Sequence, residues 1–169
     1  MTKLLLTLHV LAAVLTVGPV AVAASMFPAY LRQALAPPVA AHPAPAAGTA
    51  APPPEPPVPA LGVLHRICRV YALVGVAVPL FGFATASSLG VLGSVWLIVS
   101  ILLTAAAAAV LALLVLPAQE AALDAVREPA RAPLPRAARQ LAAYTGVFNL
   151  LWATVTVLMI IRPGSTTSA

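Results

Sequence analysis

The chain has 169 residues, of which 62% are hydrophobic and only 8% are charged, and its mean hydropathy is +1.02. Soluble globular domains carry about 25% charged residues, so this composition excludes an ordinary soluble surface. The formal net charge of +5 does not indicate nucleic acid binding, because the basic residues flank apolar stretches, where the positive-inside rule accounts for them.

Four apolar stretches follow one another along the chain. They cover about residues 4–27, 64–83, 91–116 and 141–161. A helix needs roughly 20 apolar residues to cross a hydrocarbon core of about 30 Å. Inside lipid the backbone polar groups must be satisfied within the segment, which favours helices. We therefore expect an all-α, integral membrane four-helix bundle, with residues 1–169 forming a single membrane domain.

The first stretch also has features of a secretory signal peptide, with Lys3 before an apolar run and a small-residue cleavage pattern at Ala21–Ala23. The charge distribution argues against this interpretation. The chain segments after the first and third stretches hold seven arginines, whereas the opposite side holds only Lys3 and Arg162. The seven are Arg32, Arg66, Arg69, Arg127, Arg131, Arg136 and Arg139. The positive-inside rule then predicts a multi-pass protein of the cell membrane with both termini extracytoplasmic.

The segment Ala34–Ala60 has a different composition from the rest of the chain. Ten of its 27 residues are proline, most of the others are alanine, and Glu55 is its only charged residue. Such a tract does not build a helix or a packed core. We expect a disordered, polyproline-like cytoplasmic linker. A ligand for an SH3-type domain is the alternative.

Two shorter segments are predicted from their turn chemistry. The sequence ATASSLG at Ala84–Gly90 predicts the turn between the second and third spans. Residues Gln119–Arg127 carry charge and are followed by Pro129, which favours a short surface helix after the third span. High arginine, alanine and proline usage is typical of a GC-rich bacterial genome.

His9 is the candidate functional residue of the first span. It lies about 8 Å inside the outer edge at 1.5 Å per residue. Residues 9, 13, 16, 20 and 23 share one helix face and form a small, mildly polar stripe, which includes Thr16, so the histidine is expected to face the bundle. An imidazole there can ligate haem iron or copper or carry a proton. The alternative is a structural hydrogen bond to a neighbouring helix.

Further polar side chains are predicted inside the membrane. They are Ser100 and Thr104 in the third span and Thr145 and Asn149 in the fourth. They predict either hydrogen bonds between helices or a polar pocket with His9 on one wall. His65, Arg66 and Arg69 are expected to face anionic headgroups, and the lone Cys68 to fill space. All four acids lie outside the spans. No catalytic residue and no metal ligand set is predicted.

The spans at LHVLAAVLTVGP, HRICRVYALVGVAVPLFGFAT and TGVFNLLWATVTVLMIIRPGS resemble a bacterial family of predicted integral membrane proteins, the domain-of-unknown-function family twenty-two sixty-nine. The Leu-His opening of the first span is also similar to the copper-resistance D proteins and to the J-type protoporphyrinogen oxidases. The second likeness implies that His9 holds haem. No later span contains a lysine to match that oxidase's second key residue.

Together these features predict a small four-span membrane protein that is a non-enzymatic structural or accessory component without a cofactor. Its expected surroundings are the lipid bilayer and a second copy or another membrane protein. The first alternative is a haem- or copper-binding membrane redox protein that uses His9. The second is a small solute exporter that acts as an oligomer, although the spans lack the carboxylate on which proton-coupled transport usually depends.

Overall fold

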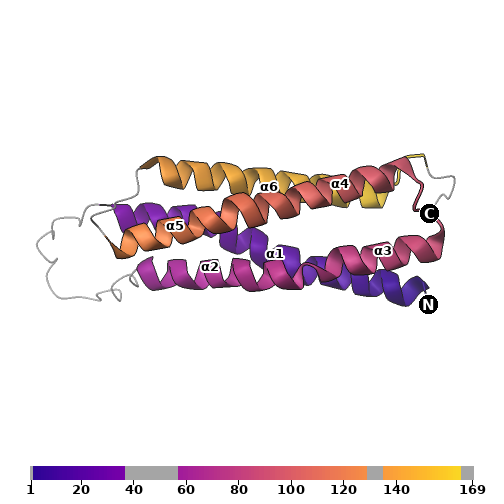
Figure 1. Cartoon of the computed structure of the whole chain (residues 1–169), viewed down its shortest axis with the longest axis horizontal. Coiled ribbons are helices and arrows are strands. Elements are labelled where there is room, and N and C mark those ends of the chain that lie inside the picture. Colours follow the sequence, from indigo (N-terminus) through magenta and orange to yellow (C-terminus); the bar gives the residue numbers. More distant parts are fainter. Residues whose placement is uncertain (1, 37–56, 129–134, 165–169) are drawn as a thin grey trace, which may run out of the picture.

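The computed structural model describes residues 2–36, 57–128 and 135–164, and this part of the chain is helical with no strand. The elements in chain order are α1 (Thr2–Leu35), α2 (Pro57–Val74), α3 (Ala77–Leu89), α4 (Val95–Ala109), the π-helical segment η1 (Val110–Val115), α5 (Leu116–Arg127) and α6 (Pro135–Ile161). Helices α2 and α3 form one bent rod, and α4, η1 and α5 form another (Figure 1). The predicted all-α, four-helix arrangement is confirmed.

Four helical segments are long and apolar enough to cross a membrane. They are Thr2–Leu35, Val58–Leu89, Val95–Arg127 and Arg136–Ile161. Large apolar side chains are exposed on their outer surfaces, with Val95 76% and Ile160 75% exposed. Contact of these apolar side chains with water is unfavourable, whereas contact with the hydrocarbon of a bilayer is not. With its 34 residues, α1 is about 51 Å long at 1.5 Å per residue, so it extends beyond a hydrocarbon core of about 30 Å.

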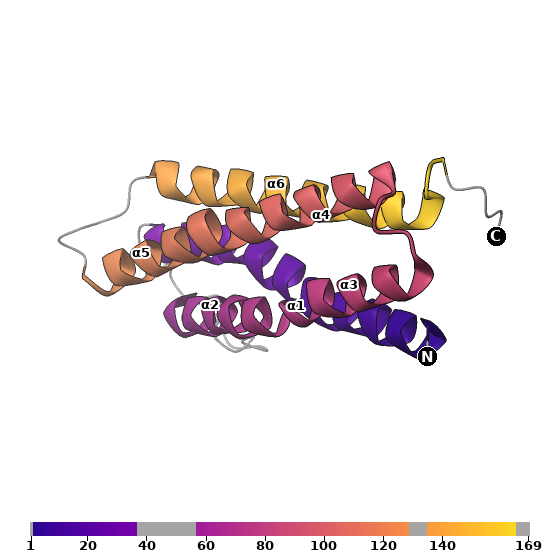
Figure 2. The same cartoon turned by 45° about the vertical axis from the view of Figure 1, so that its right-hand side comes forward.

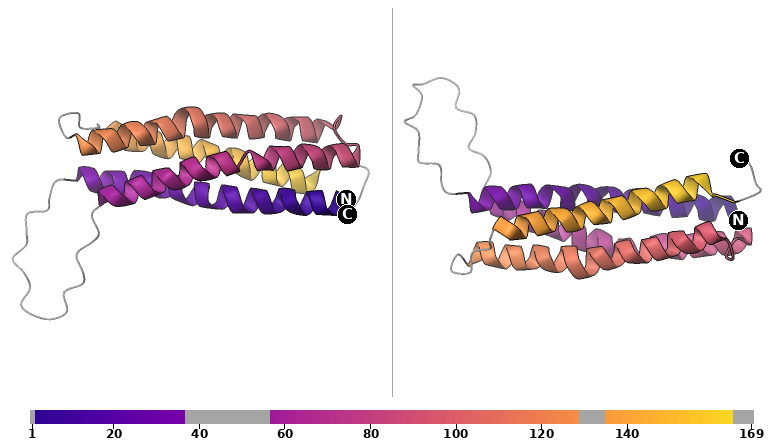
Figure 3. Two further views of the ribbon diagram at one scale, coloured as in Figure 1. Left: turned by 60° about the horizontal axis from the view of Figure 1, so that its bottom comes forward. Right: turned by 90° about the horizontal axis from the view of Figure 1, so that it is seen from above.

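Helix α1 packs against several other helices of the bundle. Along its length it contacts α2 and α3 on one side and α6 on another. Helix α4 and η1 pack along α6, while α5 packs against α2 (Figures 2 and 3). The two buried apolar clusters lie one after the other along the bundle, one around Ala24 and Phe148 and the other around Phe27 and Leu141. The core therefore begins near the middle of α1 and continues toward its C-terminal end.

Most of the arginines in the described residues lie toward one end of the bundle, and Arg162 lies at the other. Arg32 is in the last turn of α1, Arg127 is in the last turn of α5, and Arg136 is at the start of α6, whereas Arg66 lies near the middle of α2. The N-terminal end of α1, the connection between α3 and α4 and the C-terminal end of α6 lie at the other end (Figure 1). The charge grouping used to predict the topology thus corresponds to two opposite ends of the structure.

The connection between the second and third spans lies later in the chain than predicted. Helix α3 continues through Ala84–Leu89, and Gly90 ends it in the left-handed conformation with φ 67°. The Gly90 N–H reaches the carbonyls of Ala86 and Ser87, and the Val91 N–H reaches that of Ala86 at 3.2 Å. Ser88 does not break the helix because its hydroxyl donates to the Thr85 carbonyl at 2.8 Å.

Two other expectations change at the arginine-rich end. Residues Gln119–Arg127 belong to α5, which continues the third span directly instead of forming a separate surface helix, because its Gln119, Ala122 and Leu123 are buried against the bundle. The predicted linker at Ala34–Ala60 falls mostly outside the described residues. Its first two residues belong to α1 and its last four to α2. Proline is tolerated in the first turn of a helix, where its missing N–H has no intrahelical partner.

Candidate functional site

His9 joins α1 to α3. Its ring Nδ1 lies 2.9 Å from the carbonyl oxygen of Val78. A carbonyl only accepts hydrogen bonds, so this Nδ1 carries the proton. In the neutral ring Nε2 then holds the lone pair, and Nε2 has no hydrogen-bond partner within residues 2–36, 57–128 and 135–164. The side chain is half-buried, with one nitrogen used for packing and the other left as an acceptor.

Gly82 makes room for the imidazole of His9. A Cβ atom at this position would lie 2.9 Å from His9 Cε1 and 3.2 Å from Nδ1. Gly82 follows Val78 by one helical turn, so the glycine and the accepting carbonyl lie on the same side of α3. We call His9, Val78 and Gly82 the histidine clamp. Sequence analysis missed both partners; a glycine one turn after an unremarkable valine was the only signal.

Three of the other predicted polar side chains form hydrogen bonds within their own helices and not with His9. Thr16, Ser100 and Thr104 each donate to a backbone carbonyl one turn earlier in their own helix. Such local bonds let a hydroxyl lie in an apolar environment without a partner on another helix. The described residues therefore do not form the predicted polar pocket with His9 on one wall.

Two polar residues of α6 reach α1. The hydroxyl of Thr145 lies 3.4 Å from the Ala24 carbonyl, and Nδ2 of Asn149 lies 3.2 Å from Oγ of Ser25. The Asn149 Oδ1 atom is buried, and no described residue donates to it. These contacts match the prediction of interhelical hydrogen bonds, each worth about 0.6–2 kcal/mol in membranes.

A cavity of about 140 Å³ lies between the four spans. Its lining is mainly apolar. The lining residues come from α1, from α2 and α3 on both sides of the break between them, from α4 and η1, and from α6. The lining residues are Thr16, Val17, Val20, Tyr71, Ala72, Gly75, Val76, Pro79, Thr104, Ala108, Leu111, Phe148 and Trp152. Of the predicted polar residues only Thr16 and Thr104 belong to it, whereas His9 and Asn149 do not.

The helices around this cavity are irregular. Between α2 and α3 the N–H of Val76 bonds to the Leu73 carbonyl at 3.2 Å and that of Val78 to Gly75 at 3.0 Å, three residues back instead of four. Pro79 explains the break, because it has no N–H and its ring crowds the carbonyl four residues earlier, on Gly75. In η1 the turn is wider, and the Leu116 N–H reaches Leu111, five residues back, just before Pro117. Such π segments are frequent at functional sites.

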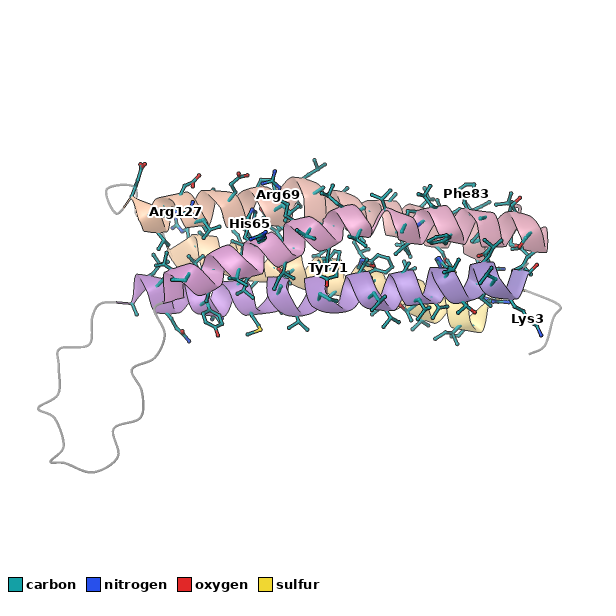
Figure 4. The ribbon with its side chains drawn as sticks, turned by 90° about the horizontal axis from the view of Figure 1, so that it is seen from below. Lys3, His65, Arg69, Tyr71, Phe83 and Arg127 are labelled. Atoms are coloured by element: carbon teal, nitrogen blue, oxygen red, sulfur yellow. The ribbon has the colours of Figure 1, made fainter. Side chains whose placement is uncertain are left out.

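A second polar contact joins α2 to α5 near the arginine-rich end. His65 Nδ1 lies 3.1 Å from Gln119 Oε1, and Gln119 Nε2 lies 3.7 Å from the sulfur of Cys68. Gln119 and Cys68 are both completely buried, so the sulfur fills space as predicted. Only Arg66 and Arg69 of the expected basic surface are exposed, because His65 turns toward Gln119 (Figure 4).

Four helices that are long and apolar enough to cross a membrane are consistent with an all-α, multi-pass membrane protein. No group of three or more histidine, cysteine or acidic side chains that can hold a metal ion occurs in the described parts of the chain. No family model matches the chain, and no curated protein and no solved structure matches it significantly.

Proposed function

We propose that the protein is a non-enzymatic structural or accessory component of the bacterial cell membrane, in keeping with the sequence resemblance to an integral membrane family of unknown function. The observation that carries this proposal is the histidine clamp. His9 donates to the Val78 carbonyl and packs on Gly82, so the one ionisable side chain deep in the first span already has a packing role.

A partner within the membrane is part of this proposal. Ser25 is exposed on α1 and accepts a hydrogen bond from Asn149 of α6, so this contact lies at the outer surface of the bundle, although Oδ1 of Asn149 is buried. In hydrocarbon such groups favour contact with another helix, from a second copy or from a different membrane protein.

The second candidate is a haem- or copper-binding redox protein. The absence of a hydrogen-bond partner for Nε2 among the described residues favours this candidate. A metal-binding histidine donates its other ring N–H to a carbonyl or carboxylate and keeps one lone pair for the metal. Val78 supplies such a carbonyl. His9 is the residue that would hold the group.

A spectrum and a metal analysis distinguish the two candidates. We expect protein purified in mild detergent to show no haem absorption band and no stoichiometric copper. We also expect His9→Gln to accumulate in the membrane like the parent, because glutamine keeps a donor for the Val78 carbonyl. Stoichiometric haem or copper in the parent that is absent from His9→Gln would overturn the structural proposal and support the redox candidate.

We further propose that the arginine-rich end faces the cytoplasm and that both termini are extracytoplasmic. Arg32, Arg127, Arg136 and Arg139 belong to the ends of α1, α5 and α6 on that side, and Arg66 and Arg69 belong to α2, whereas Lys3 and Arg162 lie at the opposite ends of α1 and α6. Alkaline phosphatase fused after Ala169 should be active and green fluorescent protein dark. Fusions after Arg127 should give the reverse pair. A fluorescent protein that is bright at Ala169 would contradict this orientation.

A further inference from the structure

The cavity between the spans is open on one side of the bundle. Its exposed lining residues are Val76 and Pro79 of the α2–α3 rod and Ala108 of α4. The lining residues of α1 and α6 are buried or half-buried. The mouth therefore lies between the α2–α3 rod and the α4–η1–α5 rod, where the surrounding lipid meets it from the side.

The interior of the cavity suits an apolar occupant. Val17, Val20 and Phe148 line its inner part, and the hydroxyls of Thr16 and Thr104 donate to their own helices. A buried water needs two to four polar partners, which this lining does not provide. Its volume of about 140 Å³ is close to that of an engineered apolar cavity of about 150 Å³ that stays dry and binds benzene.

One polar group lies on the arginine-rich side of the mouth, and a second lies inside the cavity on its α1 side. Arg69 is exposed, no described residue forms an ion pair with it, and it precedes the lining residue Ala72 by one helical turn. Tyr71 lines the cavity between α2 and α1, and its hydroxyl has no hydrogen-bond partner among the described residues (Figure 4). A cation and an unpaired donor thus border an apolar chamber.

The spacing along α2 matches the cross-section of a lipid monolayer. Arg69 and Val76 are seven residues apart, which is about 10 Å along a helix. The interfacial layer on each side of a bilayer is roughly 5–8 Å thick. With Arg69 at the phosphate level, Val76 and the mouth lie at the depth of the first acyl carbons, on the same face of α2 as Arg69.

We propose that the cavity is a binding site for one acyl chain of an anionic phospholipid. The chain enters between the two rods, and a short segment of it occupies the cavity of about 140 Å³. The phosphate binds Arg69 beside the mouth. The irregular backbone at Gly75–Val76 and in η1 keeps the two rods apart at this depth, which is what leaves space for the chain.

Quenching of Trp152 fluorescence tests this site, because Trp152 lines the cavity. The chain has two tryptophans, so Trp96→Phe leaves Trp152 as the single reporter. This protein is reconstituted in phosphatidylcholine bilayers that contain a minor fraction of brominated phosphatidylglycerol or, in parallel, brominated phosphatidylcholine. We expect the anionic lipid to associate about fivefold more strongly, the ratio that about 1 kcal/mol from one arginine gives.

Two pairs of variants in the Trp96→Phe protein separate the site from the bulk lipid. Ala108→Phe fills the mouth, and Ala105→Phe places the same side chain on an exposed position of α4 that does not line the cavity. Arg69→Gln removes the cation, and Arg136→Gln removes an exposed arginine near the same end. We expect Ala108→Phe and Arg69→Gln to abolish the preference for the anionic lipid and both controls to keep it.

Any other pattern overturns the proposal. Equal quenching by the two brominated lipids in the reporter protein means bulk contact alone. A preference that survives Ala108→Phe means a headgroup site on the surface with no chain in the cavity, and one that survives Arg69→Gln removes the assigned headgroup contact. If Ala108→Phe does not accumulate in the membrane, Ala108→Leu with Ala105→Leu as its control gives the same decision.

Discussion

Gln119→Ala is expected to destabilise the protein by about 2–4 kcal/mol, because the substitution leaves both a cavity and an unsatisfied polar group. Gln119 is completely buried in α5, where its amide links His65 and Cys68 of α2. Without it the His65 Nδ1 loses its acceptor within a half-buried contact. Equilibrium unfolding in mixed detergent and SDS micelles, followed by the loss of helical circular dichroism, measures the change in the free energy of unfolding.

Gln140→Ala is the matched control for Gln119→Ala. Gln140 lies on α6 toward the same end of the bundle but is exposed, so we expect its free energy of unfolding to stay within about 0.5 kcal/mol of the parent. Equal destabilisation by the two substitutions would contradict the bridging role of Gln119. A large effect of Gln119→Ala that disappears in a His65→Ala background would identify the hydrogen bond itself as the source.

Gly82→Ala is expected to cost about 1–3 kcal/mol, the range for a buried polar group that loses its hydrogen bond. The new Cβ would lie 2.9 Å from His9 Cε1, so the ring has to move away from α3. Any such movement lengthens the 2.9 Å contact between Nδ1 and the Val78 carbonyl. The same unfolding measurement reports the loss, and amide hydrogen exchange should increase in the N-terminal part of α1.

Gly146→Ala provides the control for Gly82→Ala, because nothing lies within 4 Å of a Cβ built at Gly146. Alanine is the better helix former by about 1 kcal/mol, so Gly146→Ala is expected to be neutral or stabilising. Combining Gly82→Ala with His9→Ala should remove the penalty of the glycine substitution, since no ring remains to collide with the new methyl group. An equal penalty of Gly82→Ala in both backgrounds would show that the clamp is not its cause.

The four membrane-compatible helices were predictable from the sequence because they depend on length and hydropathy alone. Any helix of about 20 apolar residues meets the requirement of the bilayer, whatever its neighbours are. The ends of the helices depended on local contacts instead. Ser88 bonds within its own helix, and Gln119 is buried by a second helix, so neither behaves as its polarity alone suggests.

The site was only partly predictable for a related reason. His9 was identified from its type and position, since an imidazole inside an apolar stretch needs a partner. The partner was not, because the accepting group is the backbone carbonyl of Val78, which any residue carries, and only the approach of α3 over Gly82 makes it available. Hydroxyl and amide side chains were the expected partners, yet Thr16, Ser100 and Thr104 bond within their own helices.

The sequence by itself therefore determined that the chain is an all-α protein with four membrane-compatible helices and that most of its arginines follow the first and third of them, because hydropathy and charge act locally along the chain. The tertiary structure alone decided which helix meets His9, that Gln119 is a buried bridge, and that a cavity lies beside Gly75 and Pro79. Those features arise where backbones from distant segments approach one another, and the close approach of two helices depends on the shapes of both surfaces.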